Sequence, residues 1–298
     1  MDTTTWLLDG DPAIRWQTRR DLLDDPDGAA ADRALVETEG WGARLLGLQR
    51  GDGTWGHGVW TQRDWLGVDD AMLLLALLGA QGPRTRAAVD RVVAGVDWGA
   101  DWWNHPFFDG EVEPCINGRV LVAGAAFGHP SALIVERLID EQQDDGGWNC
   151  YAQTRADPGS FHSTICALEG LTGYRDAGGP FAVADAIERG HAYLLERGLL
   201  RRKRDGMVID PSWTSAAFPP YWHYDVLRGL DHLRAAGVAP DDRLTEVLDA
   251  VEAARGEDGR WRMDRVHPGE VLVAMEEQGE PSRWNTLRAL RVLRWAGR

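Results

Sequence analysis

Two cysteines, a histidine and a glutamate have the residue types and the spacing to hold a metal ion. Cys115 and His162 lie 47 residues apart and take matching positions at the start of two similar segments, with Glu113 just before the cysteine. Thiolate and imidazole are preferred zinc ligands, and a catalytic zinc site needs three protein ligands and an open position. We therefore expect zinc on Cys115 and His162, with Glu113 or Cys150 as the third ligand. A buried apolar cysteine and a helix-terminal histidine would explain the same residues without a metal.

A pair of carboxylates, Asp69 and Asp70, stands at the start of another apolar segment. We expect the pair to face the same cavity, where either residue could transfer a proton, bind the metal or accept a hydrogen bond from His162. Carboxylates at a helix amino terminus also stabilise the helix dipole, by a few tenths to about 1 kcal/mol, without any chemical role. The sequence leaves these explanations open.

The segment from Pro219 to Asp225 combines aromatic and titratable side chains. His223 and Asp225 could form an acid–base pair or complete a metal shell. Residues two apart on a helix point about 200° apart, so both reach one site only if one of them precedes the first turn. The alternative is a capped helix under an aromatic lid. If the segment does line a cavity, its aromatic residues Tyr221, Trp222 and Tyr224 contact the substrate.

Further substrate contacts are expected from other segments. Trp102 and Trp103 could wall an apolar cavity or stabilise a carbocation through their ring faces, although core packing explains them equally well. Asn285 is a polar residue at the start of a similar segment, and Arg19 could supply positive charge for an anionic substrate.

The elements that must position these residues are revealed by a phrase that recurs three times. The copies are Gln49-Arg-Gly-Asp-Gly-Thr-Trp55, Gln142-Gln-Asp-Asp-Gly-Gly-Trp148 and Arg255-Gly-Glu-Asp-Gly-Arg-Trp261. Each copy follows an amphipathic pattern, makes an Asp-Gly turn and ends in a tryptophan, so the chain is predicted to be a helical repeat protein.

Two types of helix alternate around these turns. One type is apolar nearly all round, as a helix packed on both sides requires, and is expected near residues 16–23, 68–77, 115–124, 162–171, 223–230 and 285–290. The other type is apolar on one face and is expected at residues 32–48, 84–96, 131–143, 183–197 and 241–255. The pattern predicts an all-α fold with an inner ring of helices inside an outer ring.

The repeated turn resembles the QW repeat of squalene and terpene cyclases and of protein prenyltransferase β subunits. The resemblance covers nearly the whole chain and implies one α/α toroid domain of about six helical hairpins over residues 1–298. In prenyltransferase β subunits an Asp-x-Cys element and a histidine in a Phe/Tyr-His-Thr context bind zinc, which implicates Cys115 and His162, with Glu113 in place of the aspartate. The Asp69-Asp70 segment is similar to the Asp-x-Asp-Asp-Thr-Ala acid motif of class II cyclases, but its first aspartate is Gly67 and its threonine is missing.

Composition limits the remaining possibilities. The formal charge of −15 argues against a nucleic-acid partner, because such binding relies on clustered Lys and Arg. No apolar run approaches the ~20 residues of a membrane span, and the amino terminus has no secretory signal pattern. Three cysteines make no disulfide framework in a reducing compartment. We expect a cytoplasmic protein that is a monomer or a homodimer.

These observations predict a zinc-dependent enzyme that acts on a small, partly apolar substrate in a central cavity. An isoprenoid is one candidate for this substrate. One alternative is a metal-free class II terpene cyclase with Asp69 or Asp70 as the proton donor. The other alternative is a binding module that holds a hydrophobic ligand without turnover.

Overall fold

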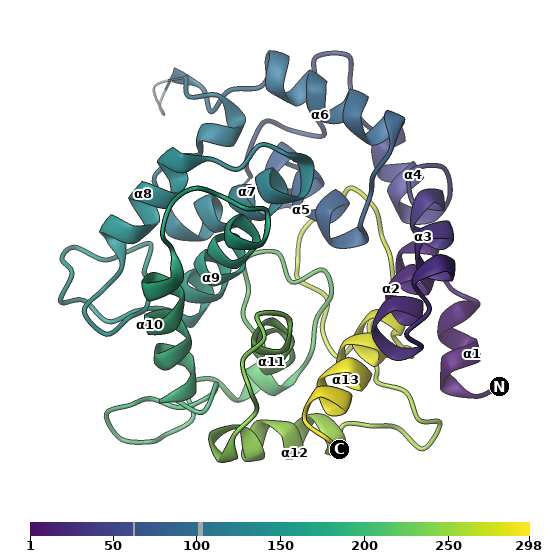
Figure 1. Cartoon of the computed structure of the whole chain (residues 1–298), viewed down its shortest axis with the longest axis vertical. Helices are drawn as coiled ribbons and strands as arrows, with labels where there is room; N and C mark the ends of the chain where they lie inside the picture. The colour runs from purple at the N-terminus through teal and green to yellow at the C-terminus, as the bar shows by residue number, and fades with distance from the viewer. Residues whose placement is uncertain (62, 101–103) are drawn as a thin grey trace.

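The computed structural model describes residues 1–61, 63–100 and 104–298, and over these residues the chain is helical (Figure 1). Between the helices, the described residues form isolated β-bridges and no strand, so the prediction of an all-α fold is confirmed. The first α-helices are α1 (Thr3–Leu8), α2 (Pro12–Leu22), α3 (Pro26–Leu35), α4 (Gly40–Gly47), α5 (Val68–Leu78), α6 (Pro83–Gly95) and α7 (Pro114–Phe127). The later ones are α8 (Ala132–Glu141), α9 (Phe161–Asp176), α10 (Ala184–Leu195), α11 (Val226–Ala235), α12 (Thr245–Ala253) and α13 (Arg283–Trp295). Short 3₁₀ helices are η2 (Phe107–Asp109), η3 (Pro211–Thr214) and η4 (Asp242–Leu244).

Six of these helices contact one another in a closed circuit. Helix α5 contacts α7, α7 contacts α9, α9 contacts α11, α11 contacts α13, and α13 contacts α2. The side chains of Trp16 and Gln17 on α2 then donate hydrogen bonds to the carbonyls of Leu78 and Leu77 on α5, which closes the circuit. In Figure 1, α6, α8, α10 and α12 lie along the outside of these helices.

The two helix types differ in burial as their sequences predict. Nine of the eleven residues of α5 are buried, including both of its aspartates. Only three of the ten residues of α8 are buried, and they form one apolar face. The apolar sequence of α5 therefore suits an inner helix, which has neighbours on both sides, and the amphipathic sequence of α8 suits an outer helix, which has one face in water.

Each copy of the repeated turn fastens the end of the helix before it, which is α4, α8 or α12. The indole nitrogens of Trp55, Trp148 and Trp261 donate to the backbone carbonyls of Leu45, Leu138 and Val251, over 2.8, 2.7 and 2.7 Å. Each bond spans ten residues, so the three turns share one structure. In the first two copies the turn's glutamine also donates to the next outer helix, Gln49 to Ala88 and Gln142 to Ala186. The three copies of the phrase therefore have the same spacing because each forms the same indole-to-carbonyl hydrogen bond.

Two predicted helix ranges need correction. The segment 32–48 is not one helix but parts of α3 and α4, because Gly40 has a φ of +64° and Asp11 accepts a hydrogen bond from the backbone nitrogen of Trp41. The segment predicted at 223–230 starts only at Val226, because Asp225 is the N-cap of α11. A contact with the distant residue Asp11 helps to set the first limit, and a local N-cap sets the second.

Helices α7 and α9 approach so closely that a methyl group would not fit between them. A Cβ atom on Gly118 of α7 would lie 2.2 Å from the carbonyl oxygen of Cys166 on α9. We expect Gly118→Ala to lower the free energy of unfolding by about 1–3 kcal/mol, as overpacking does. Urea denaturation measures this. Gly173→Ala is the matched control, because its nearest contact is 3.4 Å away and the helix gains propensity; equal stability of the two variants would contradict the close packing.

Two buried histidines join α10 to α11. The Nε2 atoms of His191 and His232 lie 3.0 Å apart, so one ring donates and the other accepts. Burial lowers the pKa of His191 to about 3, and the charge of Arg175 adds to this shift. Burial lowers the pKa of His232 to about 4, where the charge of Arg228 adds to the shift and that of Asp231 opposes it. Both rings are therefore neutral at neutral pH.

This pair makes stability fall as the solution is acidified. The unfolded chain protonates each histidine near pH 6.5, whereas the folded chain resists protonation until about pH 3 to 4. Between these values the unfolded state binds more protons, so the free energy of unfolding drops with falling pH, by up to about 1.4 kcal/mol per pH unit for each ring. Urea titrations from pH 7 to pH 4.5 should show a shallower pH dependence for His191→Gln than for the exposed-residue control His57→Gln. Equal slopes would contradict the assignment.

Candidate functional site

The predicted metal ligands meet in one cavity, at the amino-terminal ends of α7 and α9. The cavity has a volume of about 340 Å³ and is lined by Glu113, Cys115, Cys150 and His162. Cys115 lies in the first turn of α7, and Cys150 lies in the loop that follows the second repeated turn. The remaining lining residues include the aromatic side chains of Trp60, Tyr151 and Trp222 and the hydroxyls of Ser160 and Ser163.

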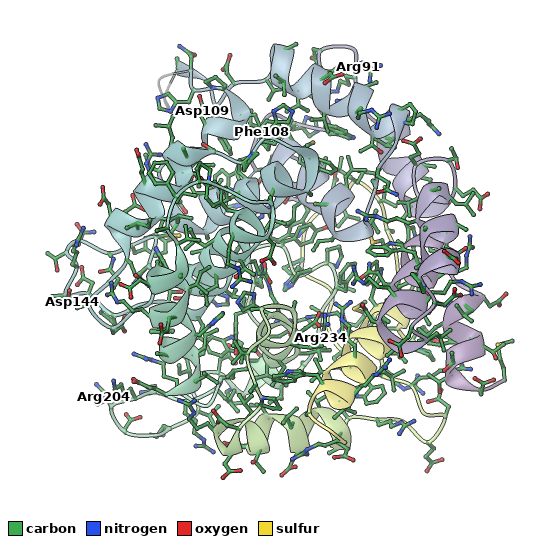
Figure 2. All side chains as sticks on the ribbon, viewed as in Figure 1. Arg91, Phe108, Asp109, Asp144, Arg204 and Arg234 are labelled. Atoms are coloured by element: carbon green, nitrogen blue, oxygen red, sulfur yellow. The ribbon has the colours of Figure 1, made fainter. Side chains whose placement is uncertain are left out.

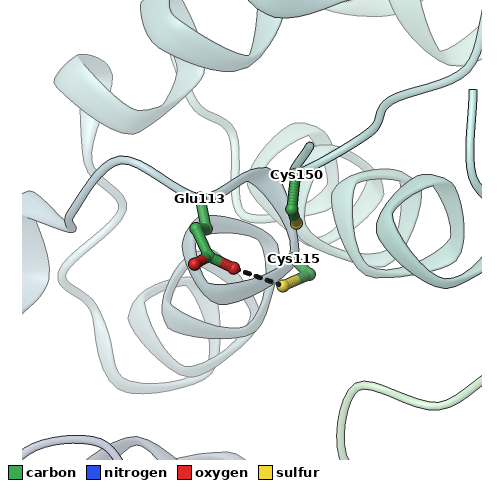
Figure 3. Close-up of side chains that lie close together, drawn as sticks. All are labelled: Glu113, Cys115 and Cys150. Atoms are coloured by element: carbon green, nitrogen blue, oxygen red, sulfur yellow. Dashed lines mark hydrogen bonds between the residues drawn. The ribbon is translucent and has the colours of Figure 1, made fainter. Parts of the chain in front are cut away.

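Three of these residues form a group that could hold a metal ion. One carboxylate oxygen of Glu113 and the sulfur atoms of Cys115 and Cys150 all lie within 4.8 Å of one another (Figure 3). The Cys115 thiol donates to Oε2 of Glu113 over 3.7 Å. A tetrahedral zinc ion with bonds of about 2.3 Å to sulfur and 2.0 Å to oxygen separates such ligand atoms by about 3.5 Å. The donor set therefore suits a metal ion, and its three ligand atoms would lie at about this distance from one another when they bind one.

The pKa values of the two thiols are shifted in opposite directions. Their contact raises the pKa of Cys115, with burial adding to the rise, and the same contact lowers the pKa of Cys150. Ser163 supports the lowered value, because its hydroxyl lies 3.2 Å from the Cys150 sulfur. Cys150 is thus the thiol that ionises first. A thiolate is the form that binds a metal.

His162 lines the cavity but does not belong to this group. Its Nδ1 accepts a hydrogen bond from the backbone nitrogen of Tyr224 over 2.8 Å. Burial, with the charge of Arg228, lowers the pKa of His162 to about 4, so the ring is neutral. A neutral ring that accepts at Nδ1 carries its proton on Nε2 and has no lone pair there for a metal. The structure therefore supports Cys150, in place of the predicted His162, as the ligand that joins Cys115 and Glu113.

Asp69 and Asp70 are not in this cavity but buried in an ion cluster with Arg119 of α7. A single guanidinium nitrogen of Arg119 lies 3.0 Å from Asp69 and 2.5 Å from Asp70, and each of the three side chains is almost fully buried. Burial raises the pKa of Asp69 to about 8, with the charge of Asp70 adding to the rise and that of Arg119 opposing it. At neutral pH the cluster therefore holds a proton on Asp69. Asp70 also accepts a hydrogen bond from the backbone nitrogen of Gly67, which caps α5.

The structure separates His223 from Asp225, which were predicted as an acid–base pair. Asp225 is the N-cap of α11, where it accepts from the backbone nitrogen of Arg228 over 2.7 Å. The ring of His223 lies between those of Trp222 and His267, with centroids 3.7 and 3.8 Å away. Burial and His267 lower the pKa of His223 to about 2, so the ring is neutral. The capped-helix alternative therefore describes Asp225, and His223 lies in the stack of aromatic rings that the same alternative expects.

Most of the other predicted substrate contacts are structural. Tyr224 is fully buried and donates to the carbonyl of Leu199, and Asn285 is fully buried and donates to the carbonyls of Ala216 and Arg262. Tyr221 stacks on Trp65, and Arg19 forms ion pairs with Asp25 and Asp32. Trp222 alone of the predicted contacts within the described residues lines the cavity of Cys115. Trp102 and Trp103 lie outside the described residues.

Sequence reasoning missed three residues that shape these sites. They are Arg119, Ser163 and His267. Arg119 could have been found, because an arginine inside an apolar inner helix requires a buried counter-charge, and the paired aspartates of the preceding inner helix offer one. His267 carried no signal, since it lies in a loop that reaches the site from the far end of the chain.

The comparisons leave the family open. No protein-family model matches the sequence, and no curated protein matches it. Among the described residues, no helix combines the length and the apolar character needed to cross a membrane.

Proposed function

We propose that this protein is a zinc-dependent enzyme that acts on a small, partly apolar substrate in the cavity of Cys115. The observation that supports this proposal is the meeting of Glu113, Cys115 and Cys150 within 4.8 Å at a cavity of about 340 Å³. Three protein ligands beside an open cavity is the arrangement of catalytic zinc sites, whereas structural zinc sites use four protein ligands.

The chain's own residues would bind and polarise the substrate. Zinc held by the three ligands would supply a Lewis acid, or lower the pKa of a thiol or water. His162, neutral and with its proton on Nε2, can donate a hydrogen bond to a substrate oxygen in the cavity. Trp60 and Trp222 provide apolar walls that would exclude water from a bound apolar group.

We propose further that the helices form an α/α toroid of about six hairpins, similar to those of terpenoid cyclases and prenyltransferase β subunits. The closed circuit of inner helices and the repeated tryptophan turn support this. By analogy of fold, the substrate class that we propose is isoprenoid or isoprenoid-like. Thiolate ligands suit a compartment that keeps thiols reduced, such as the cytoplasm.

One observation favours a second candidate, a proton-donating cyclase. Asp69 has a pKa of about 8 and therefore carries a proton at neutral pH, as a catalytic acid must. However, Asp69 is only 2% exposed and does not line the cavity of Cys115. Its contact with Arg119 explains the residue as part of the buried ion cluster.

The test compares turnover in zinc-loaded and chelator-treated protein. Short-chain esters, apolar thiols and allylic diphosphates serve as trial substrates, and mass spectrometry detects products. We expect turnover only with zinc, none in Cys150→Ala, and a kcat about 100-fold lower in His162→Ala, which loses one donor to the substrate but keeps its zinc. Cys166→Ala is the control, because Cys166 is a fully buried core residue.

Three outcomes would contradict the proposal in different ways. Turnover that survives zinc removal but is lost in Asp69→Asn would support the cyclase. Tight retention of an apolar ligand with no turnover would support a binding module. Equal turnover in Cys150→Ala and wild type would place the chemistry elsewhere.

A further inference from the structure

A second cavity opens among the inner helices and is separate from the cavity of Cys115. It has a volume of about 310 Å³, and its lining includes residues of α2, α5, α7, α9, α11 and α13. None of its lining residues belongs to the cavity of Cys115. In Figure 2, the labelled Arg234 of α11 lies beside the centre of the molecule, between α11 and α13.

The walls of this cavity present hydrogen-bond donors that have no partner. The indole nitrogen of Trp284 and the hydroxyl of Thr172 are buried and form no hydrogen bond within the described residues. Both residues line the cavity, and they are 2% and 7% exposed. An indole N–H can only donate, so a group that satisfies it must be an acceptor.

Arg288 adds further donors to the same cavity. It is only 4% exposed, and its Nη1 donates to the carbonyl of Ala217 over 3.0 Å. Its other nitrogens approach carboxylates only at a distance, with Nη2 lying 3.5 Å from Asp225 and Nε lying 4.0 Å from Asp231. These separations exceed those of direct N–H···O bonds, so the guanidinium keeps donors for a third acceptor.

The charges around this cavity nearly cancel. Arginines outnumber carboxylates in the lining, and they are Arg20, Arg228, Arg234, Arg288 and Arg291. The Asp231 side chain is only 13% exposed, yet Arg291 and Arg234 lower its pKa to about 2 against the effect of burial. Asp21 and Asp225 lie behind Arg291 and Arg288 and bring the neighbourhood close to neutral. The preference for an anion therefore comes from the donors rather than from net charge.

Apolar side chains complete the wall. Leu77, Val122, Phe218 and Pro220 line the cavity together with the ring of Trp284. Donors that gather around a buried guanidinium beside an apolar wall are complementary to an oxyanion that carries a hydrocarbon group. We propose that this second cavity binds a small organic oxyanion, a carboxylate or a phosphate ester, with its head group on Arg288, Trp284 and Thr172.

The experiment measures the binding of four probes with the same hydrocarbon chain by calorimetry. The probes are hexanoate, hexyl phosphate, hexanol and hexylamine, and each is titrated into chelator-treated and zinc-loaded protein. We expect one of the two anions to bind at one site per chain, with hexanol and hexylamine at least tenfold weaker and with zinc having no effect. The stronger anion identifies the head group. Independence from zinc separates this site from the proposed metal site, whatever the outcome there.

Variants locate the site. Arg288→Gln should weaken anion binding by about 10- to 100-fold, the range for one charge-assisted hydrogen bond. Arg234→Gln, at the partly exposed rim, tests the same cavity if the buried variant fails to fold, and should weaken binding severalfold. Arg294→Gln is the control, since it lies on α13 but does not line the cavity. Equal binding of hexanol and the anions, no binding of either anion, or anion binding unchanged in both Arg288→Gln and Arg234→Gln would overturn the proposal.

Discussion

Replacing Arg119 by methionine is expected to lower the free energy of unfolding by about 3–5 kcal/mol, because the change leaves the buried carboxylate of Asp70 without its counter-charge. Arg119 is 1% exposed and contacts both Asp69 and Asp70 through one nitrogen. Methionine replaces the aliphatic stem of the side chain and keeps its apolar contacts, so most of the loss reports the missing guanidinium charge. Urea denaturation at pH 7 measures it.

Asp69→Asn is the matched variant, and it should behave differently. Burial raises the pKa of Asp69 from 3.8 to about 8, so the native carboxyl is already neutral at pH 7. We expect the amide variant to be at least as stable as wild type at pH 6, because the buried carboxyl must take up a proton on folding and the amide need not. Between the unfolded and folded pKa values the native state holds the extra proton, so wild type loses stability as the pH rises and the amide variant does not. The variant should therefore gain on wild type as the pH rises from 6 to 8.

Two results would contradict this account of the ion cluster. Denaturation of Arg119→Met at the same urea concentration as wild type would mean that the carboxylate of Asp70 does not depend on the arginine. A loss of several kcal/mol in Asp69→Asn at pH 6 is expected only of a carboxylate that is ionised in the folded state. Asp70 is the carboxyl with which Asp69 is compared. It accepts hydrogen bonds from both Arg119 and Gly67.

The second large effect concerns zinc affinity. We expect Cys115→Ala and Cys150→Ala each to weaken zinc binding by at least about 100-fold, since the loss of a direct ligand should exceed the 10- to 100-fold cost of losing a supporting contact. His162→Gln should bind zinc within about threefold of wild type, because its Nδ1 is occupied by the backbone nitrogen of Tyr224. Competition with a chromogenic chelator measures the affinities.

Cys166→Ala controls for the general effect of removing a thiol. Cys166 is fully buried and lies outside the group of three ligands. If His162→Gln lost zinc as severely as Cys150→Ala, the histidine would be a ligand after rearrangement of its ring. The prediction made from the sequence, and not the arrangement of the structure, would then be correct.

The sequence predicted those features that depend on local patterns. The tryptophan turns recur because each indole bonds a carbonyl ten residues back, a relation that spacing alone can reveal. Cys115, Glu113 and His162 were placed at one cavity because helix starts repeat along the chain. Whether a side chain in such a place is a ligand depends on its hydrogen bonds, which spacing does not encode. His162 shows this, since the backbone of a distant residue, Tyr224, sets its tautomer.

Contacts between distant segments account for the other misjudged residues. Asp225 and Asn285 start inner helices as predicted, yet both are used by the fold, one as a helix cap and the other as a bridge between loops. Arg19 looked available for an anion and instead pairs with Asp25 and Asp32 of its own neighbourhood. The sequence shows which residues gather near a helix start, whereas the partners that occupy them become visible only in three dimensions.

X-ray absorption at the zinc edge, on protein loaded with one equivalent of zinc, tests the central claim most directly. If Glu113, Cys115 and Cys150 hold the metal, the spectrum shows two sulfur atoms at about 2.3 Å and two lighter atoms at about 2.0 Å. One of these lighter atoms belongs to Glu113 and the other to water or substrate. Cys150→Ala should then show a single sulfur. A shell without sulfur, or protein that retains no zinc after removal of the excess, would contradict the claim.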